Sequence, residues 1–287
     1  MFMDAGLLRG LLRCLGILPL PLLHALGGLA GDLLWLARSK PRRIAELHMT
    51  KLFPDAPPSV RRRIARQSLR EFGKCIFESP AIWFGPERRL LRWIDAPAAA
   101  QQLQRLAGTG GAIILCPHIG SWELAGMFCA RHGGITSLYK PQKGTLDTLI
   151  KQGRERLGAQ LVSSDNGGVR ALLSALQKGR RIGVLPDQDP PPGAGDFAPL
   201  FNQPAHTPTL VTRLAARTGV PVLFCYAERL RRGAGFRFHL VPAPSRVGED
   251  LAALNQGVEK IIIHLPGQYW WAYPRFRRRP SETEHFY

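Results

Sequence analysis

The sequence has few cysteines and no metal-binding pattern. Its cysteines are odd in number and widely spaced: Cys14, Cys75, Cys116, Cys129 and Cys225. Most lie inside apolar stretches, which suits reduced core thiols in the cytosol better than a disulfide framework. No pair has the spacing of zinc ligands, and the 8 histidines include no His-Glu-x-x-His pattern. We therefore expect no metal.

Acidic residues are scarce relative to basic ones. The 287 residues include 21 Asp plus Glu against 39 Lys plus Arg, for a formal net charge of +18. This balance predicts anionic partners: acidic lipid headgroups, acidic carrier proteins or nucleic acid. The basic residues cluster at 38–43, 61–66, 229–232 and 277–279. The sequence lacks zinc-finger spacing, an RNA-recognition motif and a helix-turn-helix signal, so we expect no nucleic acid partner.

A proton-handling pair follows a short apolar run. Ile113 to Cys116 is typical of a buried strand, and Pro117 and Gly120 predict an abrupt turn after it. His118 lies in that turn. Glu123 lies in the first turn of the helix expected next, close enough to bond one imidazole nitrogen. A histidine oriented by a carboxylate is a general base for an alcohol attacking a carbonyl.

Ser121 has two interpretations from its position. It can cap the helix that begins at Trp122, because serine is a favoured N-cap residue. It could instead be a nucleophile, but the Gly-x-Ser-x-Gly elbow of such enzymes is missing, so capping is the simpler explanation. Chance placement of His118 and Glu123 is the corresponding alternative to a catalytic pair.

The rest of the chain alternates between strand and helix patterns. Strands are expected at 113–116, 136–139, 160–163, 181–185, 220–227 and 236–241, and helices at 57–84, 145–157, 168–178, 208–218 and 249–265. This order predicts an α/β fold with a mostly parallel central sheet flanked by helices, and a ligand cleft at the carboxyl ends of the strands. Asp187, Gln188 and Asp189 follow one such strand, on the same rim as His118 if the two strands are parallel.

The N-terminal segment, residues 1–40, is a candidate membrane anchor, followed by one domain over residues 41–287. Residues 15–37 are mostly apolar and long enough to span a bilayer as a helix. Pro19, Pro21, His24 and Asp32 weaken a span, so an interfacial helix is the second option and a buried core helix the third. The basic residues after the segment favour a cytoplasmic body.

Four blocks in chain order resemble one family. His118-Ile-Gly-Ser-Trp-Glu123 resembles the His-x4-Asp/Glu block of the lysophospholipid acyltransferase superfamily, and specifically of the bacterial lipid A biosynthesis (late) acyltransferases. The other blocks are Arg43 to Pro54, in which His48 replaces the usual Asn, Leu185 to Asp189, and Gln268 to Pro280. The resemblance implies a fold similar to that of glycerol-3-phosphate acyltransferases, carried behind an N-terminal anchoring helix.

The resemblance also implies a reaction, its partners and a place. The enzyme would move an acyl chain from an acyl-carrier-protein or coenzyme A thioester to a hydroxyl of a hydroxyacyl chain on a Kdo-bearing lipid A precursor. It would act on the cytoplasmic face of the bacterial inner membrane, in contact with the membrane surface and without a cofactor. His118 would be the base and Glu123 its orienting partner. Substrate contacts are expected from Ser121, Tyr139, Lys140, Arg154, Arg156, Asp187, Gln188 and Asp189.

Several alternatives remain beside this function. Because the His-x4-Glu block is shared across the superfamily, the acceptor could be a lysophospholipid or another glycolipid. A basic membrane-binding protein without catalysis would also explain the charge and the N-terminal segment. The tail residues Tyr269, Trp270, Trp271 and Tyr273, before Arg275 to Arg279, suggest an aromatic belt at the membrane interface, with core packing as the alternative.

Overall fold

A computed structural model of the chain describes residues 5–108, 110–141, 144–281 and 285–287. Its centre is a six-stranded sheet in the order β3-β2-β4-β1-β7-β8. The strands are β1 (Ala112–Leu115), β2 (Ile135–Tyr139), β3 (Ala159–Ser163), β4 (Arg181–Val184), β7 (Val222–Arg229) and β8 (Phe236–Pro242). All neighbours are parallel except β7 and β8. The expected mostly parallel sheet is therefore confirmed.

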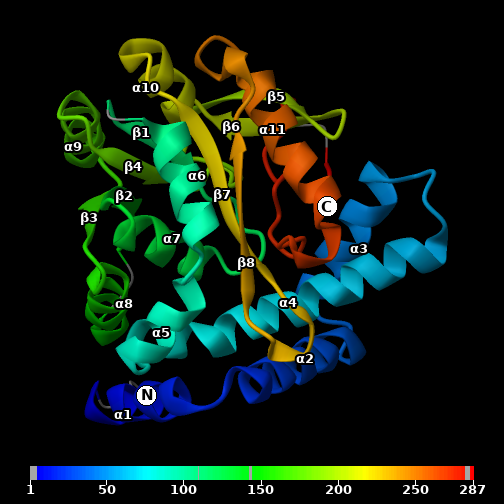
Figure 1. Cartoon of the computed structure of the whole chain (residues 1–287). Coiled ribbons are helices and arrows are strands. Elements are labelled where there is room, and N and C mark those ends of the chain that lie inside the picture. The colour runs from blue at the N-terminus through cyan, green and yellow to red at the C-terminus, as the bar shows by residue number, and fades with distance from the viewer. Residues whose placement is uncertain (1–4, 109, 142–143, 282–284) are drawn as a thin grey trace.

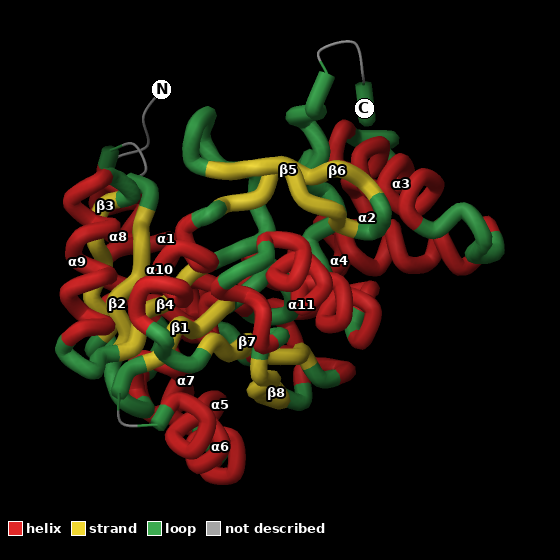
Figure 2. The backbone as a smooth tube through the Cα atoms, turned by 90° about the horizontal axis from the view of Figure 1, so that it is seen from above, coloured by secondary structure: helices red, strands yellow, loops and turns green. Residues whose placement is uncertain are grey.

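Helices cover both faces of this sheet. Side chains alternate along each strand, so Ile114 of β1 joins one core and Ile113 joins the other. The first core contains residues of α5 (Glu87–Ile94), α6 (Pro97–Ala107) and α7 (Trp122–Arg131). The second contains residues of α9 (Asn166–Gln177), α10 (Leu210–Thr218) and α11 (Leu251–His264). Figure 2 shows α6 and α11 on opposite sides of the strands.

The six helices expected beyond the N-terminal segment are all present, α7 among them. They include α4 (Pro58–Phe84) and α8 (Thr145–Glu155), beside α9, α10 and α11. Two of them begin at aspartate caps: Asp165 accepts from the backbone of Gly168 at 2.9 Å, and Asp250 from Ala252 at 2.8 Å. The antiparallel pair β5 (Gly195–Leu200) and β6 (Gln203–Pro208) was not expected from the sequence.

The N-terminal segment forms two helices instead of one. α1 (Ala5–Ile17) and α2 (Leu20–Leu36) are bent by 115° at the break before Pro19. Within the described residues, no single helix is long and apolar enough to cross a membrane, and only this bent pair reaches the necessary length and composition. Both helices lie along α4, and in Figure 1 the sheet lies on the other side of α4 from them. α3 (Lys40–Leu52) follows α2.

Small residues let α2 approach α4 closely. A Cβ at Gly31 would lie 2.5 Å from the backbone of Arg70, and Gly27 and Gly73 leave equally little space between the two helices. The side of α2 that faces away from α4 carries exposed leucines. The N-terminal helices are thus packed on the domain through one face and leave an apolar face uncovered.

A buried ion network also connects α2 to the sheet. Arg229 at the end of β7 donates to both carboxylate oxygens of Glu78 on α4, at 2.9 and 2.7 Å. His24 of α2 bonds the same carboxylate at 2.8 Å. Burial opposes ionisation of Glu78, but Arg229 and His24 outweigh it and lower its pKa to about 2. α2, α4 and β7 therefore share one charged centre.

Candidate active site

Strand register places His118 opposite Asp187. β1 and β4 are adjacent and parallel, with Leu115 beside Val184. Each strand is followed by a short segment, and the residue three places beyond its end is His118 in one case and Asp187 in the other. The two side chains therefore meet at the carboxyl edge of the sheet, where α/β folds place their ligands.

Asp187 holds His118 through two hydrogen bonds. Its Oδ1 lies 2.9 Å from His118 Nδ1, and its Oδ2 accepts from the His118 backbone N–H at 2.9 Å. Burial of Asp187 opposes its ionisation, but the neighbouring His118 outweighs this effect, and the pKa of Asp187 lies below its usual value. A carboxylate in this position favours the tautomer with the proton on Nδ1, which leaves Nε2 as an acceptor.

The other imidazole nitrogen faces Gln188. The side-chain nitrogen of Gln188 lies 3.1 Å from His118 Nε2, so the amide can donate to the lone pair that a base needs. An alcohol entering the site would take the place of that amide. Asp187 and Gln188 thus act on opposite nitrogens of one ring.

The turn that carries His118 packs against β7 and against the C-terminal segment. Gly120 has φ +57°, and a Cβ there would overlap the carbonyl oxygen of Ala227. The His118 carbonyl accepts from the backbone of Trp270 at 3.0 Å. The rings of Trp122 and Trp270 flank the imidazole, with centroids 5.1 and 5.5 Å from its own. His118 is therefore held in a narrow, aromatic-walled position.

Glu123 does not orient His118, and this expectation was wrong. Glu123 accepts from Trp83 Nε1 at 3.0 Å and from Arg154 Nε at 2.9 Å, with a further bond from Arg154 Nη2. Glu123 is buried in the first turn of α7. Burial of Arg154 opposes its charge, but Glu123 prevails and raises the pKa of the guanidinium. A second ion pair therefore forms in the first turn of α7, on a carboxylate other than the one that holds His118.

Ser121 does not cap α7 as expected. It occupies the N-cap position, but its hydroxyl makes no capping bond, and its Oγ is buried without a hydrogen-bond partner among the described residues. Its backbone N–H donates to Ala227 at 2.8 Å, and that bond holds the turn on β7. The Ser121 hydroxyl thus stabilises neither the turn nor the start of α7 by a hydrogen bond to the described residues.

The other predicted substrate residues are dispersed. Tyr139 is buried, donates to Asp147 at 2.7 Å and lies with its ring centroid 5.5 Å from the Arg154 guanidinium, which brings it to the Glu123 pair. Lys140 follows it and is exposed. Arg156 donates to the carbonyls of residues 82, 83 and 85 and so completes the end of α4. Of the two arginines, only Arg154 lies with the candidate site.

Asp189 is occupied by protein contacts. His206 of β6 bonds it at 2.8 Å, Arg278 donates at 3.0 Å, and Arg277 also donates to it. Burial opposes the charge of Asp189, but Arg277 and His206 outweigh it, and the pKa of this carboxyl falls. Asp189 was expected to contact substrate, and in this structure its carboxylate joins the β5–β6 hairpin to the C-terminal segment.

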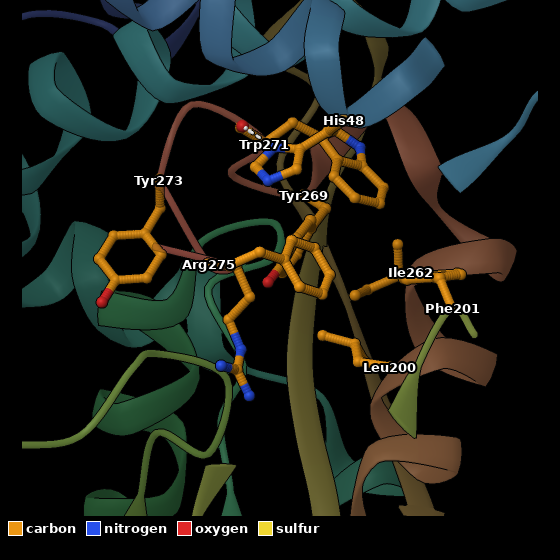
Figure 3. A pocket seen from close by; sticks show the side chains of 9 residues that line it. His48, Leu200, Phe201, Ile262, Tyr269, Trp271, Tyr273 and Arg275 are labelled. Atoms are coloured by element: carbon orange, nitrogen blue, oxygen red, sulfur yellow. Dashed lines mark hydrogen bonds between the residues drawn. The ribbon is translucent and has the colours of Figure 1, made fainter. Parts of the chain in front are cut away.

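The expected aromatic belt lies largely in the core. Figure 3 shows Tyr269 and Trp271 pointing inward beside His48 of α3, and both are buried. The Trp271 carbonyl lies 2.7 Å from His48 Nδ1. Arg275 is also buried, and donates to the His206 carbonyl at 2.7 Å. Trp270 is only partly buried, but it stacks on Phe72, so core packing is the correct alternative for this segment.

Within the described ranges, no three His, Cys, Asp or Glu side chains converge as metal ligands would. The arrangement at the sheet edge is instead that of acid–base chemistry. It offers a histidine oriented by one carboxylate, a reversible amide contact on its free nitrogen, and an arginine held by a second carboxylate. This combination can deprotonate an alcohol and stabilise negative charge on a neighbouring oxygen.

Comparisons with known proteins agree with the sequence blocks. A family model described as bacterial lipid A biosynthesis acyltransferase matches residues 4–278. A lipid A biosynthesis lauroyltransferase of Escherichia coli K12 is 29% identical over 272 residues, covering 92% of this chain and 88% of that protein. A palmitoleoyltransferase of the same strain is 26% identical, covering 94% and 90%. A phosphatidylinositol mannoside acyltransferase of Mycobacterium tuberculosis H37Rv is 28% identical, covering 80% and 74%.

Proposed function

The chain belongs to the bacterial lipid A biosynthesis acyltransferase family, and from that premise we propose that it transfers a fatty acyl chain from an acyl-carrier-protein thioester to a lipid A precursor. The acceptor group is a hydroxyl of a hydroxyacyl chain on a Kdo-bearing precursor. The observation that carries the chemistry is His118, held by Asp187 on one nitrogen and open to exchange on the other.

The transfer proceeds by general base catalysis. The acceptor hydroxyl displaces the Gln188 amide from His118 Nε2 and gives its proton to that nitrogen. The alkoxide oxygen attacks the thioester carbonyl, and a C–O bond forms. The tetrahedral intermediate then expels the thiolate, which takes the proton back from Nε2. Asp187 stabilises the imidazolium between these steps. The products are the ester and the free thiol of the donor.

Glu123 and Arg154 contribute negative-charge stabilisation in this mechanism. Arg154 bonds Glu123 through Nε and Nη2, which leaves the N–H groups of Nη1 for an anionic oxygen of the reacting lipid. A guanidinium held by a buried carboxylate needs no rearrangement when charge develops. Glu123 is therefore a positioning residue for Arg154, and Tyr139 packs against the same guanidinium.

The N-terminal helices provide membrane contact. Leu7, Leu11 and Ile17 of α1 are exposed, as are Leu22, Leu29, Leu33 and Leu36 of α2. An amphipathic helix of this kind can lie in the interface with its apolar face in the lipid. We assign the enzyme to the inner membrane, with its body on the cytoplasmic face. In this arrangement the acyl chains of the acceptor lie in the lipid beside the protein.

A second acceptor class is supported by one comparison. The similarity to a phosphatidylinositol mannoside acyltransferase is of the same order as that to the lipid A enzymes. A glycolipid other than lipid A would use the same His118 chemistry. The two candidate functions differ in the lipid that gains an acyl chain. They share the same proton transfer to His118.

The test is mass spectrometry of purified lipids after incubation with the enzyme. Kdo-lipid A precursor and mannosylated phosphatidylinositol are supplied in separate reactions, each with a set of acyl-carrier-protein thioesters and, in a parallel arm, coenzyme A thioesters. A gain of one acyl mass on the precursor, absent with His118→Ala, is expected. A gain on the second lipid alone would move the enzyme to that acceptor class. Equal product from His118→Ala would remove His118 as the base.

A further inference from the structure

A basic groove lies on α4, away from His118. It has a volume of about 550 Å³ and is lined by Arg62, Arg63, Arg66 and Arg70 of α4, with Gln67 and with Trp35 of α2. In Figure 1 these two helices form the lower side of the molecule. We propose that this groove binds the phosphate of an anionic membrane lipid headgroup.

The charges in the groove are only partly neutralised. Asp32 of α2 bonds Arg66 at 2.8 Å and also pairs with Arg70. In the part of the chain that the structure describes, neither Arg62 nor Arg63 is paired with a carboxylate. The groove therefore has a surplus of three positive charges, and the two unpaired guanidinium groups can donate to phosphate oxygens.

The uncovered leucines of α2 decide between lipid and protein partners. Leu29, Leu33 and Leu36 lie on one helical face and are 57, 57 and 73% exposed. Asp32, at the edge of the groove, is one helical turn from both Leu29 and Leu36. Arginines beside an apolar helix face match the boundary between acyl chains and phosphates of a bilayer. An acidic carrier protein would satisfy the arginines but would leave these leucines in water.

This inference rests on the proposed membrane contact of α2 and is independent of the chemistry at His118. When the leucines enter the lipid, the groove comes to the level of the headgroups. A bound phosphate then holds the groove at the depth of the headgroups and so sets the tilt of α2 and α4 relative to the bilayer plane, which an apolar face alone would leave variable. The groove therefore supplies orientation as well as affinity.

The test compares two double variants of equal charge in a vesicle sedimentation assay. Arg62→Gln with Arg63→Gln removes the unpaired charges of the groove. Arg213→Gln with Arg217→Gln removes two exposed arginines from α10, at the far end of the molecule in Figure 1, and is the control. The full-length chain is sedimented with phosphatidylcholine vesicles, either pure or containing phosphatidylglycerol. Thermal unfolding of each variant verifies the fold.

The groove variant should bind the phosphatidylglycerol vesicles about 25-fold more weakly than wild type, from about a fivefold loss for each arginine. The control should stay within about twofold of wild type, because surface charges remote from the bilayer are screened. Binding of all three proteins to pure phosphatidylcholine should be equal, because it depends on the leucines.

Other results would overturn the assignment. Equal losses in the two variants would indicate diffuse charge instead of a groove. Unchanged vesicle binding of the groove variant, with a raised KM for acyl-carrier-protein thioester, would assign the groove to the carrier protein. A wild-type chain that sediments with neither vesicle type would refute the membrane contact in the proposed function together with the groove, whereas the first two results refute the groove alone.

Discussion

Asp187→Asn should abolish acyl transfer while leaving the fold intact. The Asp187 carboxylate faces two groups of His118, the backbone N–H and Nδ1. An asparagine has one oxygen and one NH₂ for these two positions. The backbone N–H can only donate, so the amide oxygen must face it. The NH₂ group then points at Nδ1, which is compelled to accept.

This arrangement inverts the tautomer of the base. With Nδ1 accepting, the ring proton resides on Nε2, the nitrogen that should receive the proton of the acceptor hydroxyl. Imposing the wrong tautomer in this way lowers kcat by about 10⁴-fold in Ser-His-Asp hydrolases, or about 5 kcal/mol in activation free energy. We expect a loss of the same order in kcat for this chain, with little change in the thermal unfolding temperature.

The assay measures initial rates by mass spectrometry for four proteins: wild type, Asp187→Asn, His118→Ala and the double variant. Because the two residues act as one unit, the double variant should be no slower than His118→Ala alone. Glu123→Gln is the matched comparison, a carboxylate-to-amide change that does not touch His118, and it should lose less. A kcat of Asp187→Asn within tenfold of the wild-type kcat would refute the tautomer argument. Losses in kcat that multiply in the double variant would refute it as well.

Three further predictions concern stability. Burial lowers the pKa of His48 from 6.5 to about 4, so the unfolded chain binds a proton at His48 at higher pH than the folded chain does. The free energy of unfolding should therefore fall by about 3 kcal/mol as the pH drops from 6.5 to 4. Urea titrations of wild type and His48→Asn at pH 7 and 4.5 should show this His48-dependent loss of stability only in wild type. Gly31→Ala should destabilise the protein by about 1–3 kcal/mol in urea titrations, because its Cβ would meet the backbone of α4, whereas Gly126→Ala, with open space around it, should be neutral or stabilising. Glu78→Gln should cost about 3–5 kcal/mol by the same measurement at pH 7, because it removes the carboxylate that Arg229 bonds through Nε and Nη2 and leaves the buried guanidinium only Glu71, at 3.5 Å; a loss below about 1 kcal/mol would contradict the buried network.

Much of the fold could be predicted because its signals are local. Buried parallel strands are continuous apolar runs, and β1 and β4 were found from such runs within one or two residues of their ends. The hairpin of β5 and β6 was missed because Pro199, Pro204 and Pro208 stand within it, and proline argues against a strand. The break between α1 and α2 had a visible signal in Pro19, which weakened the predicted span without locating the bend.

The site was predicted in part for the same reason. His118 and Asp187 were both expected on one rim of the sheet, and the equal distance of each from the end of its strand could have paired them once the strands were taken as neighbours. Glu123 was chosen as the partner because it is close in sequence, and proximity along the chain does not fix direction. Its actual partners, Trp83 and Arg154, come from α4 and α8. Contacts between separate helices leave no periodic signal in one sequence.

The pairing of β1 with β4 sets the tolerance of this enzyme to insertions. His118 and Asp187 form, in effect, one further rung of the ladder between the two strands. Residues may be added anywhere between His118 and Arg181 that the intervening helices and loops accept, since the ladder is unaffected. A single residue inserted between Leu115 and His118, or between Val184 and Asp187, would move one partner off the rung. Related chains of very different length can therefore share this pair, provided that both short segments keep their length.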